Sequence, residues 1–203
     1  FKWGLEWLSE DSARPRIPSI PVQKNQTSSQ QQEWMPTFPA PSPPVDLQAE
    51  LQLRYMLKGR KEIARYEYKD ADGNTLGYVV RLEDKQGNKI TPTLTFCVQR
   101  ESEIKSKDHD QLLIPKSHSS TSQWRWQGFG NDRPLYGLDQ LKQKPEAPVL
   151  IVEGEKTAES AKALFPDHTV VTWSGGCGSV YKSDWSVLKD RNVVIWPDND
   201  QPG

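Results

Sequence analysis

Acidic side chains gather in two short motifs toward the end of the sequence, with types and spacing that suit metal-dependent chemistry. Glu153 directly follows the apolar run VLIV, and Asp198 and Asp200 follow the apolar run VVIW. Two aspartates two residues apart in extended backbone point to the same side. Clustered carboxylates repel one another, and a hard divalent ion relieves that repulsion. We therefore predict that these three residues hold Mg²⁺, with Mn²⁺ as an alternative, for phosphoryl or nucleotidyl transfer.

Each acidic motif also has a plainer interpretation. EGEK, residues 153–156, is a normal helix start, because the helix dipole favours acidic residues in the first turn. DNDQPG, residues 198–203, is a normal polar turn. Either motif alone favours this plainer interpretation, whereas the two together, in order after successive strands, favour the metal site.

Glycines beside these motifs suggest contacts with phosphate. Gly154 allows a sharp turn from strand to helix, which brings helix N–H groups and the neighbouring Lys156 near a bound anion. A second glycine cluster, with Gly175 and Gly176, precedes Lys182 and could cradle a nucleotide phosphate. The same cluster would also serve any tight connection between a strand and a helix. Cys177, inside it, is interpreted as a small packing residue.

The elements that position these motifs begin at residue 148. Short apolar strands (VLIV, TVVTW, VVIW) alternate with the helical segment EKTAESAKALF and a glycine-rich turn. This alternation predicts a parallel sheet with helical crossovers. Functional residues of such sheets lie just beyond the carboxyl ends of the strands, where the acidic motifs fall.

The preceding region, residues 48–147, predicts a small, basic α+β subdomain. A capped segment with helical spacing starts near Asp46, and an antiparallel meander of three strands follows, with turns at Asp72-Gly73 and Gly87-Asn88. PLYGLDQL, residues 134–141, predicts a turn that enters a short helix. Candidate template-binding residues in this region are Arg54, Lys58, Arg60, Lys61, Arg65 and Arg125.

These basic residues also allow a solvated helix face as their explanation. Trp124 and Trp126 could stack on single-stranded bases, but the pattern WRW favours core packing for both. Arg81 and Arg133 are further candidates without a positional argument.

The N-terminal part looks different. Residues 1–10 predict a short amphipathic helix that ends an upstream region. Residues 11–47 are rich in Pro and Gln and predict a flexible, disordered linker.

Composition excludes several classes of protein. The 203 residues include only two cysteines and three widely spaced histidines, which excludes a disulfide scaffold and a four-cysteine zinc site. No apolar run has the length of a membrane span, and no leader pattern is present, so we expect a cytoplasmic protein without membrane contact. Residues 148–203 carry five basic and eight acidic residues, and the preceding part carries 21 basic and 19 acidic ones.

The motifs VLIVEGEKTAES and VVIWPDNDQPG resemble the TOPRIM domain of primases, topoisomerases and related nucleases, above all that of phage and plasmid primases and primase-helicases. The resemblance extends from about residue 60 to residue 203 and implies a TOPRIM-like α/β sheet for residues 148–203. It departs at Thr157, where the family often has an acidic residue. The sequence also stops before the last helix and strand of a complete TOPRIM sheet, so we expect this sheet to be truncated.

The resemblance implies a mobile-element DNA primase that makes short RNA primers on single-stranded DNA from ribonucleoside triphosphates, with a replicative helicase acting in cis or in trans. It implies that Glu153 is a general base or acid or a metal ligand, and that Asp198 and Asp200 hold Mg²⁺. Glu155 is either an accessory group or a solvated glutamate of the first helical turn. Two other functions share these residues: a TOPRIM nuclease, and a module that binds single-stranded DNA without catalysis.

Overall fold

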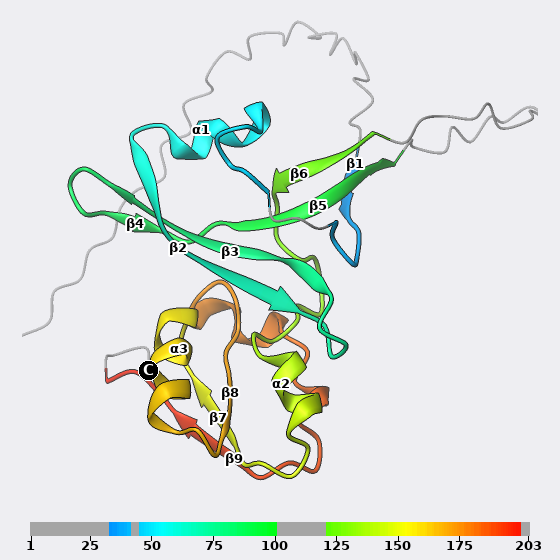
Figure 1. Ribbon diagram of the computed structural model, residues 1–203, viewed down its shortest axis with the longest axis vertical. Helices are drawn as coiled ribbons and strands as arrows, with labels where there is room; N and C mark the ends of the chain where they lie inside the picture. The colour runs from blue at the N-terminus through cyan, green and yellow to red at the C-terminus, as the bar shows by residue number, and fades with distance from the viewer. Residues whose placement is uncertain (1–32, 42–44, 101–120, 200–203) are drawn as a thin grey trace, which may run out of the picture. The chain divides into compact units, whose positions relative to one another are not determined.

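The computed structural model describes residues 33–41, 45–100 and 121–199. The predicted helix at 1–10 and most of the predicted linker lie outside the described residues. The fold is mixed α/β, with one antiparallel and one parallel sheet (Figure 1). Among the described residues, no helix has the length and apolar character needed to cross a membrane.

The antiparallel sheet has six strands. Its main path runs in the order β1-β5-β3-β2, while β4 pairs with β3 and β6 pairs with β5. The strands are β1 (Glu33–Pro36), β2 (Arg60–Lys69), β3 (Thr75–Asp84), β4 (Lys89–Ile90), β5 (Thr93–Arg100) and β6 (Ser122–Trp126). The predicted meander is confirmed, with the short strand β4 as an additional element.

The two hairpin turns that flank β3 share one design. Asp70 accepts hydrogen bonds from the backbone N–H groups of Asp72 and Asn74, and Asp84 does the same two and four residues on. The amide of Asn74 also donates to Asp70, at 2.9 Å, as the amide of Asn88 does to Asp84. Gly73 and Gly87 both have φ of 86°, the left-handed backbone predicted for these turns.

Two predictions need correction, one for the helix of the basic region and one for the linker. Helix α1 covers only Arg54–Leu57, after a single 3₁₀ turn at Leu51–Leu53, and the chain is already a strand from Arg60. The basic residues between Arg54 and Arg65 therefore do not share one helix face, because Gly59 (φ 74°) ends the helical turn. The predicted linker also extends too far: residues 33–36 form β1, and Ala40, Val45 and Leu47 are buried in the core.

The parallel sheet carries the acidic motifs. Its order is β8-β7-β9, with both neighbours parallel to the central strand, as predicted. The elements are α2 (Leu138–Gln143), β7 (Val149–Val152), α3 (Glu155–Leu164), β8 (Thr169–Val171) and β9 (Val193–Trp196), with 3₁₀ turns at Cys177–Lys182 and Ser186–Leu188. The short helix α2 confirms the interpretation of PLYGLDQL.

One hydrophobic cluster joins the two sheets. Tyr66, Tyr68 and Val79 of the antiparallel sheet pack with Leu150 and Val152 of β7 and with small residues of α3. Because Tyr68 is completely buried, its ring contributes on the order of 2 kcal/mol or more to the free energy of folding. This shared core holds α3, and with it the carboxyl end of β7, against the antiparallel sheet.

Candidate functional site at the end of the parallel sheet

Two of the three predicted carboxylates leave the sheet at the same edge. Val152 of β7 is in register with Trp196 of β9, so Glu153 and the segment Pro197-Asp198 follow neighbouring strand ends. Glu153 is half-buried and Asp198 is exposed. Asp200 lies outside the described residues. Within the described ranges no group of three acidic, histidine or cysteine side chains forms a metal-binding cluster. The structure thus places two of the three predicted ligands, Glu153 and Asp198, after neighbouring strand ends.

The residues present fit a hard divalent ion in their chemistry. Glu153 and Asp198 supply carboxylate oxygens, which Mg²⁺ prefers. Asp198 also lines a small hollow of about 90 Å³ together with Thr157 and Trp196, between α3 and β9. Thr157 therefore faces the same hollow as Asp198.

Gly154 makes the turn from β7 into α3. Its φ of 77° and ψ of 152° place it outside the helical region, and its N–H group donates to the hydroxyl of Thr172 at 2.9 Å. Thr172 is fully buried just beyond β8. This hydrogen bond ties the ends of two neighbouring strands together beside Glu153.

Glu155 is not a solvated glutamate. It is 8% exposed and accepts a 2.7 Å hydrogen bond from the hydroxyl of Tyr68. Burial raises the pKa of Glu155, and the Tyr68 hydrogen bond opposes that rise. Burial also raises the pKa of Tyr68 well above its ordinary value, and the neighbouring carboxylate raises it further. The side chain of Glu155 therefore points into the protein core and toward β2.

One helical turn further, Glu159 has a similar partner. It accepts a 2.6 Å hydrogen bond from the hydroxyl of Tyr136, and Lys162 donates to the same oxygen at 2.7 Å. Burial alone would raise the pKa of Glu159, but the hydrogen bonds from Lys162 and Tyr136 outweigh it and lower the pKa. Burial, and then the bond to Glu159, raises the pKa of Tyr136.

The glycine turn that follows β8 is exposed. Gly175 and Gly176 both have positive φ, and Lys182 stands over the ring of Tyr181, 5.4 Å from its centroid. Arg133 lies beneath the turn: its Nη1 donates to the carbonyl of Ser174 at 3.3 Å. A Cβ at Gly175 would come within 2.7 Å of that Nη1, and the φ of 94° at Gly175 is a backbone conformation that residues with side chains rarely adopt, so this position favours glycine.

The predicted template-binding cluster divides into engaged and exposed side chains. Arg65 forms a two-pronged pair with Glu62, at 2.7 and 2.8 Å, and also donates to the carbonyl of Val45. Arg54 donates to the carbonyl of Gln48, and Arg125 stacks over Trp34 at 4.4 Å. The remaining three residues are Lys58 and Lys61, which are exposed, and Arg60, which is half-buried.

The tryptophans of the WRW motif belong to the core. Trp124 is buried in the cluster of the antiparallel sheet, and Trp126 packs against that cluster while its Nε1 donates to the carbonyl of Leu53 at 2.8 Å. The prediction of core packing is confirmed for both.

A basic hollow connects the antiparallel sheet with the start of α3. It has a volume of about 300 Å³, and Arg81, Lys89 and Lys156 line it, together with Glu83 and an apolar floor that includes Tyr66. Lys89 pairs with Glu83 at 3.7 Å. The three cations come from β3, β4 and α3, so only the folded chain assembles them.

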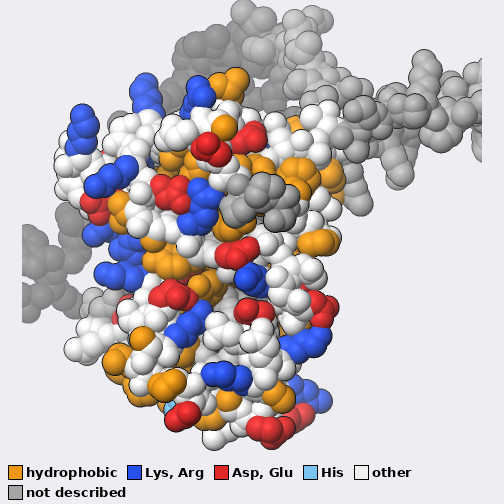
Figure 2. Space-filling model, viewed as in Figure 1, with side chains coloured by type: hydrophobic (Ala, Val, Ile, Leu, Met, Phe, Trp, Pro, Cys, Tyr) orange, Lys and Arg blue, Asp and Glu red, His pale blue; other side chains and the backbone are white. Residues whose placement is uncertain are grey.

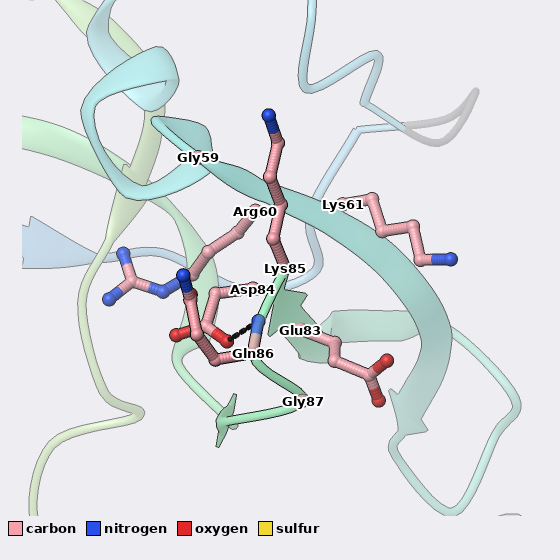
Figure 3. Close-up of a pocket in the computed structure, with 8 residues that line it drawn as sticks. All are labelled: Gly59, Arg60, Lys61, Glu83, Asp84, Lys85, Gln86 and Gly87. Atoms are coloured by element: carbon pink, nitrogen blue, oxygen red, sulfur yellow. Dashed lines mark hydrogen bonds between the residues drawn. The ribbon is translucent and has the colours of Figure 1, made fainter.

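A second hollow adjoins the first along the same hairpin and shares Glu83 with it. It measures about 730 Å³ and lies between Gly59–Lys61 and the turn from Glu83 to Gly87. Figure 3 shows Lys61 and Lys85 extended from the backbone, whereas Asp84 turns back to the N–H group of Gln86. In Figure 2, Lys and Arg side chains gather on the side of the molecule that carries α1, β2 and β4.

Residues 78–199 match the family described as Domain of unknown function (DUF6371), which is more than half of the chain. The chain belongs to the DUF6371 family. A UPF0292 protein of Archaeoglobus fulgidus is 37% identical over 73 residues, which are 35% of this chain and 55% of that protein. The chain thus spans about half the length of this curated relative.

The DUF6371 region contains most of the site. It begins in β3 and ends after Pro197-Asp198, so Arg81, Lys89 and Lys156 lie inside it, whereas the basic residues from Arg54 to Arg65 precede it. In the sequence, Arg81 is a single cation within the apolar strand YVVRLED. Its place beside Lys89 and Lys156 becomes visible only in the folded chain. No signal in the sequence linked Tyr68 with Glu155, 87 residues away.

Proposed function

We propose that this DUF6371 chain is the catalytic region of a primase with a TOPRIM-like parallel sheet. The observation that carries the proposal is the register of β7 and β9, from which Glu153 and Asp198 leave at one edge of the sheet. The parallel pairing in the order β8-β7-β9 supports the proposal, because the TOPRIM resemblance implies a parallel sheet with these motifs after its strands. The antiparallel subdomain supplies the cations that a nucleic-acid substrate requires.

The proposed reaction joins ribonucleotides on a single-stranded DNA template. A 3′-hydroxyl attacks the α-phosphate of a paired ribonucleoside triphosphate, the new phosphodiester bond forms, and pyrophosphate leaves. Glu153 either accepts the proton of that hydroxyl or shares the cation with Asp198 and Asp200. When bound, Mg²⁺ would stabilise the negative charge that develops on the phosphate oxygens.

The basic side chains have two tasks in this proposal. Arg81, Lys89 and Lys156, in the hollow that reaches the start of α3, bind the phosphates of the nucleotide or primer. Lys61 and Lys85, further along the hairpin, hold the template backbone. Gly175, Gly176 and Lys182, at the end of β8, offer a further phosphate contact on the same edge of the sheet. A helicase, in cis or in trans, is the proposed partner.

Primer synthesis on single-stranded DNA, with labelled ribonucleotides and Mg²⁺, tests the proposal. Short labelled products should appear with the wild-type chain and disappear with Asp198→Ala. Lys144→Ala is the control, because Lys144 is exposed and, among the described residues, its side chain donates to the carbonyl of Pro166 alone.

Two other outcomes identify the rival functions. Cutting of labelled DNA with Mg²⁺ but without nucleotides would identify a TOPRIM-type nuclease. Binding of single-stranded DNA that is unaffected by removal of Mg²⁺, with neither synthesis nor cutting, would identify a non-catalytic module.

A further inference from the structure

Helix α3 carries two glutamates that each accept a hydrogen bond from a tyrosine; Glu155 is buried, whereas Glu159 is exposed. Glu155 and Glu159 are four residues apart and lie on one face of the helix. Tyr68 of β2 donates to the first, and Tyr136, just before α2, donates to the second. The helix is therefore fixed at two successive turns, and the first of these turns lies next to Glu153.

The contact at the first turn is rigid and enclosed. Tyr68 is fully buried, and its ring packs against Phe129 and Tyr136 with centroids 4.9 and 5.3 Å away. Such packing fixes where the Tyr68 hydroxyl lies. A hydrogen bond to a carboxylate in this environment is among the stronger ones in proteins. Within the described residues Glu155 has no second side-chain donor.

The hydrogen bond between Tyr136 and Glu159, at the second turn, is more exposed to solvent, and Lys162 donates to the same carboxylate. Glu159 also receives Lys162, at 2.7 Å, and that ammonium group stands 4.3 Å from the centre of the Tyr136 ring. If the Tyr136 hydroxyl were lost, Glu159 would keep its lysine. Tyr136 is thus a natural control for Tyr68, because both changes remove one tyrosine hydroxyl from the same helix.

The residues on either side of Glu155 belong to the proposed site. Glu153 is two residues before it, at the edge of the parallel sheet, and Lys156 directly follows it and lines the hollow with Arg81. Any shift of the first turn of α3 would move the carboxylate and the lysine together. A displacement of about 1 Å at a reacting group can reduce a rate by about a hundredfold.

We propose that Tyr68 and Glu155 are positioning residues, whose hydrogen bond sets Glu153 and Lys156 relative to the antiparallel sheet. The proposal rests on the primase function proposed above. Neither residue touches substrate. In this proposal, catalysis depends on the alignment of the two sheets, and the hydrogen bond between Tyr68 and Glu155 maintains that alignment.

Kinetics of two matched variants test this role. Tyr68→Phe should lower kcat for primer synthesis by about 10- to 100-fold with little change in the KM for nucleotide, and Tyr136→Phe should change kcat by less than about threefold. The thermal unfolding midpoints of both variants measure the structural effect, and the midpoint of Tyr68→Phe should fall further, because buried Glu155 loses its side-chain donor whereas Glu159 keeps Lys162. The kinetics are therefore compared at a temperature at which both variants are fully folded. Glu155→Gln, which keeps an oxygen acceptor, should retain most of the activity that Glu155→Ala loses.

Binding of Mn²⁺, followed by electron paramagnetic resonance, separates this inference from the proposed function. If the wild type makes no primers, the function fails, but weaker Mn²⁺ binding in Tyr68→Phe than in Tyr136→Phe still supports positioning. Equal losses of activity in the two tyrosine variants, or equal Mn²⁺ binding in both, would overturn the inference. A wild-type chain that binds no Mn²⁺ would overturn it together with the metal site.

Discussion

Substitution of single lysines in the two hollows should change the salt dependence of binding to single-stranded DNA by a definite amount. The hollows are lined by six cations: Arg60, Lys61, Arg81, Lys85, Lys89 and Lys156. Lys89 is paired with Glu83, and Arg60 donates to the carbonyl of Met56 at 3.4 Å. Four to six of these cations are therefore available to phosphates.

Counterion release sets the size of the effect. Each phosphate contact with a single strand contributes about −0.7 to the slope of log K against log salt concentration. Four to six contacts predict a slope between about −3 and −4, and Lys61→Ala should make it shallower by about 0.7. That change corresponds to about fivefold weaker binding at 0.1 M salt, and to almost none near 1 M.

Fluorescence anisotropy of a labelled oligothymidylate, titrated over a tenfold range of salt, measures these slopes. Lys144→Ala is the matched control, because Lys144 is exposed, lies outside both hollows and is not among the candidate template-binding residues. Glu83→Gln should act in the opposite direction, strengthening binding by up to about fivefold, since it removes an anion that both hollows share. Equal slopes for Lys144→Ala and Lys61→Ala, or weaker binding by Glu83→Gln, would refute the assignment of the DNA path to these hollows.

Three further changes have definite expected results. Thr157→Asp adds a carboxylate to the hollow of Asp198 and should tighten Mn²⁺ binding several-fold, as measured by electron paramagnetic resonance; unchanged affinity would place the ion elsewhere. Gly154→Ala forces a side chain into an almost glycine-only backbone conformation (φ 77°, ψ 152°) without a steric clash, so chemical denaturation should show a loss of about 1–3 kcal/mol from backbone strain alone. The hydrogen bond from Asn88 lowers the pKa of Asp84 in the folded chain, so its stabilising effect is present above about pH 4 and is lost as the pH falls further. The free energy of unfolding of Asp84→Asn, measured against pH, should therefore fall less steeply in acid than that of the wild type, and parallel curves would contradict this.

Local patterns in the sequence predicted the elements that depend on local rules. The runs VLIV, TVVTW and VVIW became parallel strands, and the turns at Gly73 and Gly87 became hairpins, because apolar runs and left-handed turn residues need little information from elsewhere. The same rules failed between residues 46 and 65. Helical spacing there reflects the buried Leu53 and Leu57 of one short turn, and pairing with β3 then draws the following basic residues into β2.

The residues of the candidate site also fall into two groups: those that local rules predicted and those that depend on tertiary packing. Glu153 and Asp198 were predictable because the end of a parallel strand is a local position whose neighbours follow from topology. The cations of the hollow were not, since their grouping depends on how α3 packs against the antiparallel sheet. Glu155 shows the difference most clearly: a glutamate in a first helical turn is normally solvated, and only a tyrosine 87 residues earlier in the chain makes it a buried partner. Glu155, which local rules assign to solvent, is thus the residue through which the helix beside the acidic motif is bound to the antiparallel sheet.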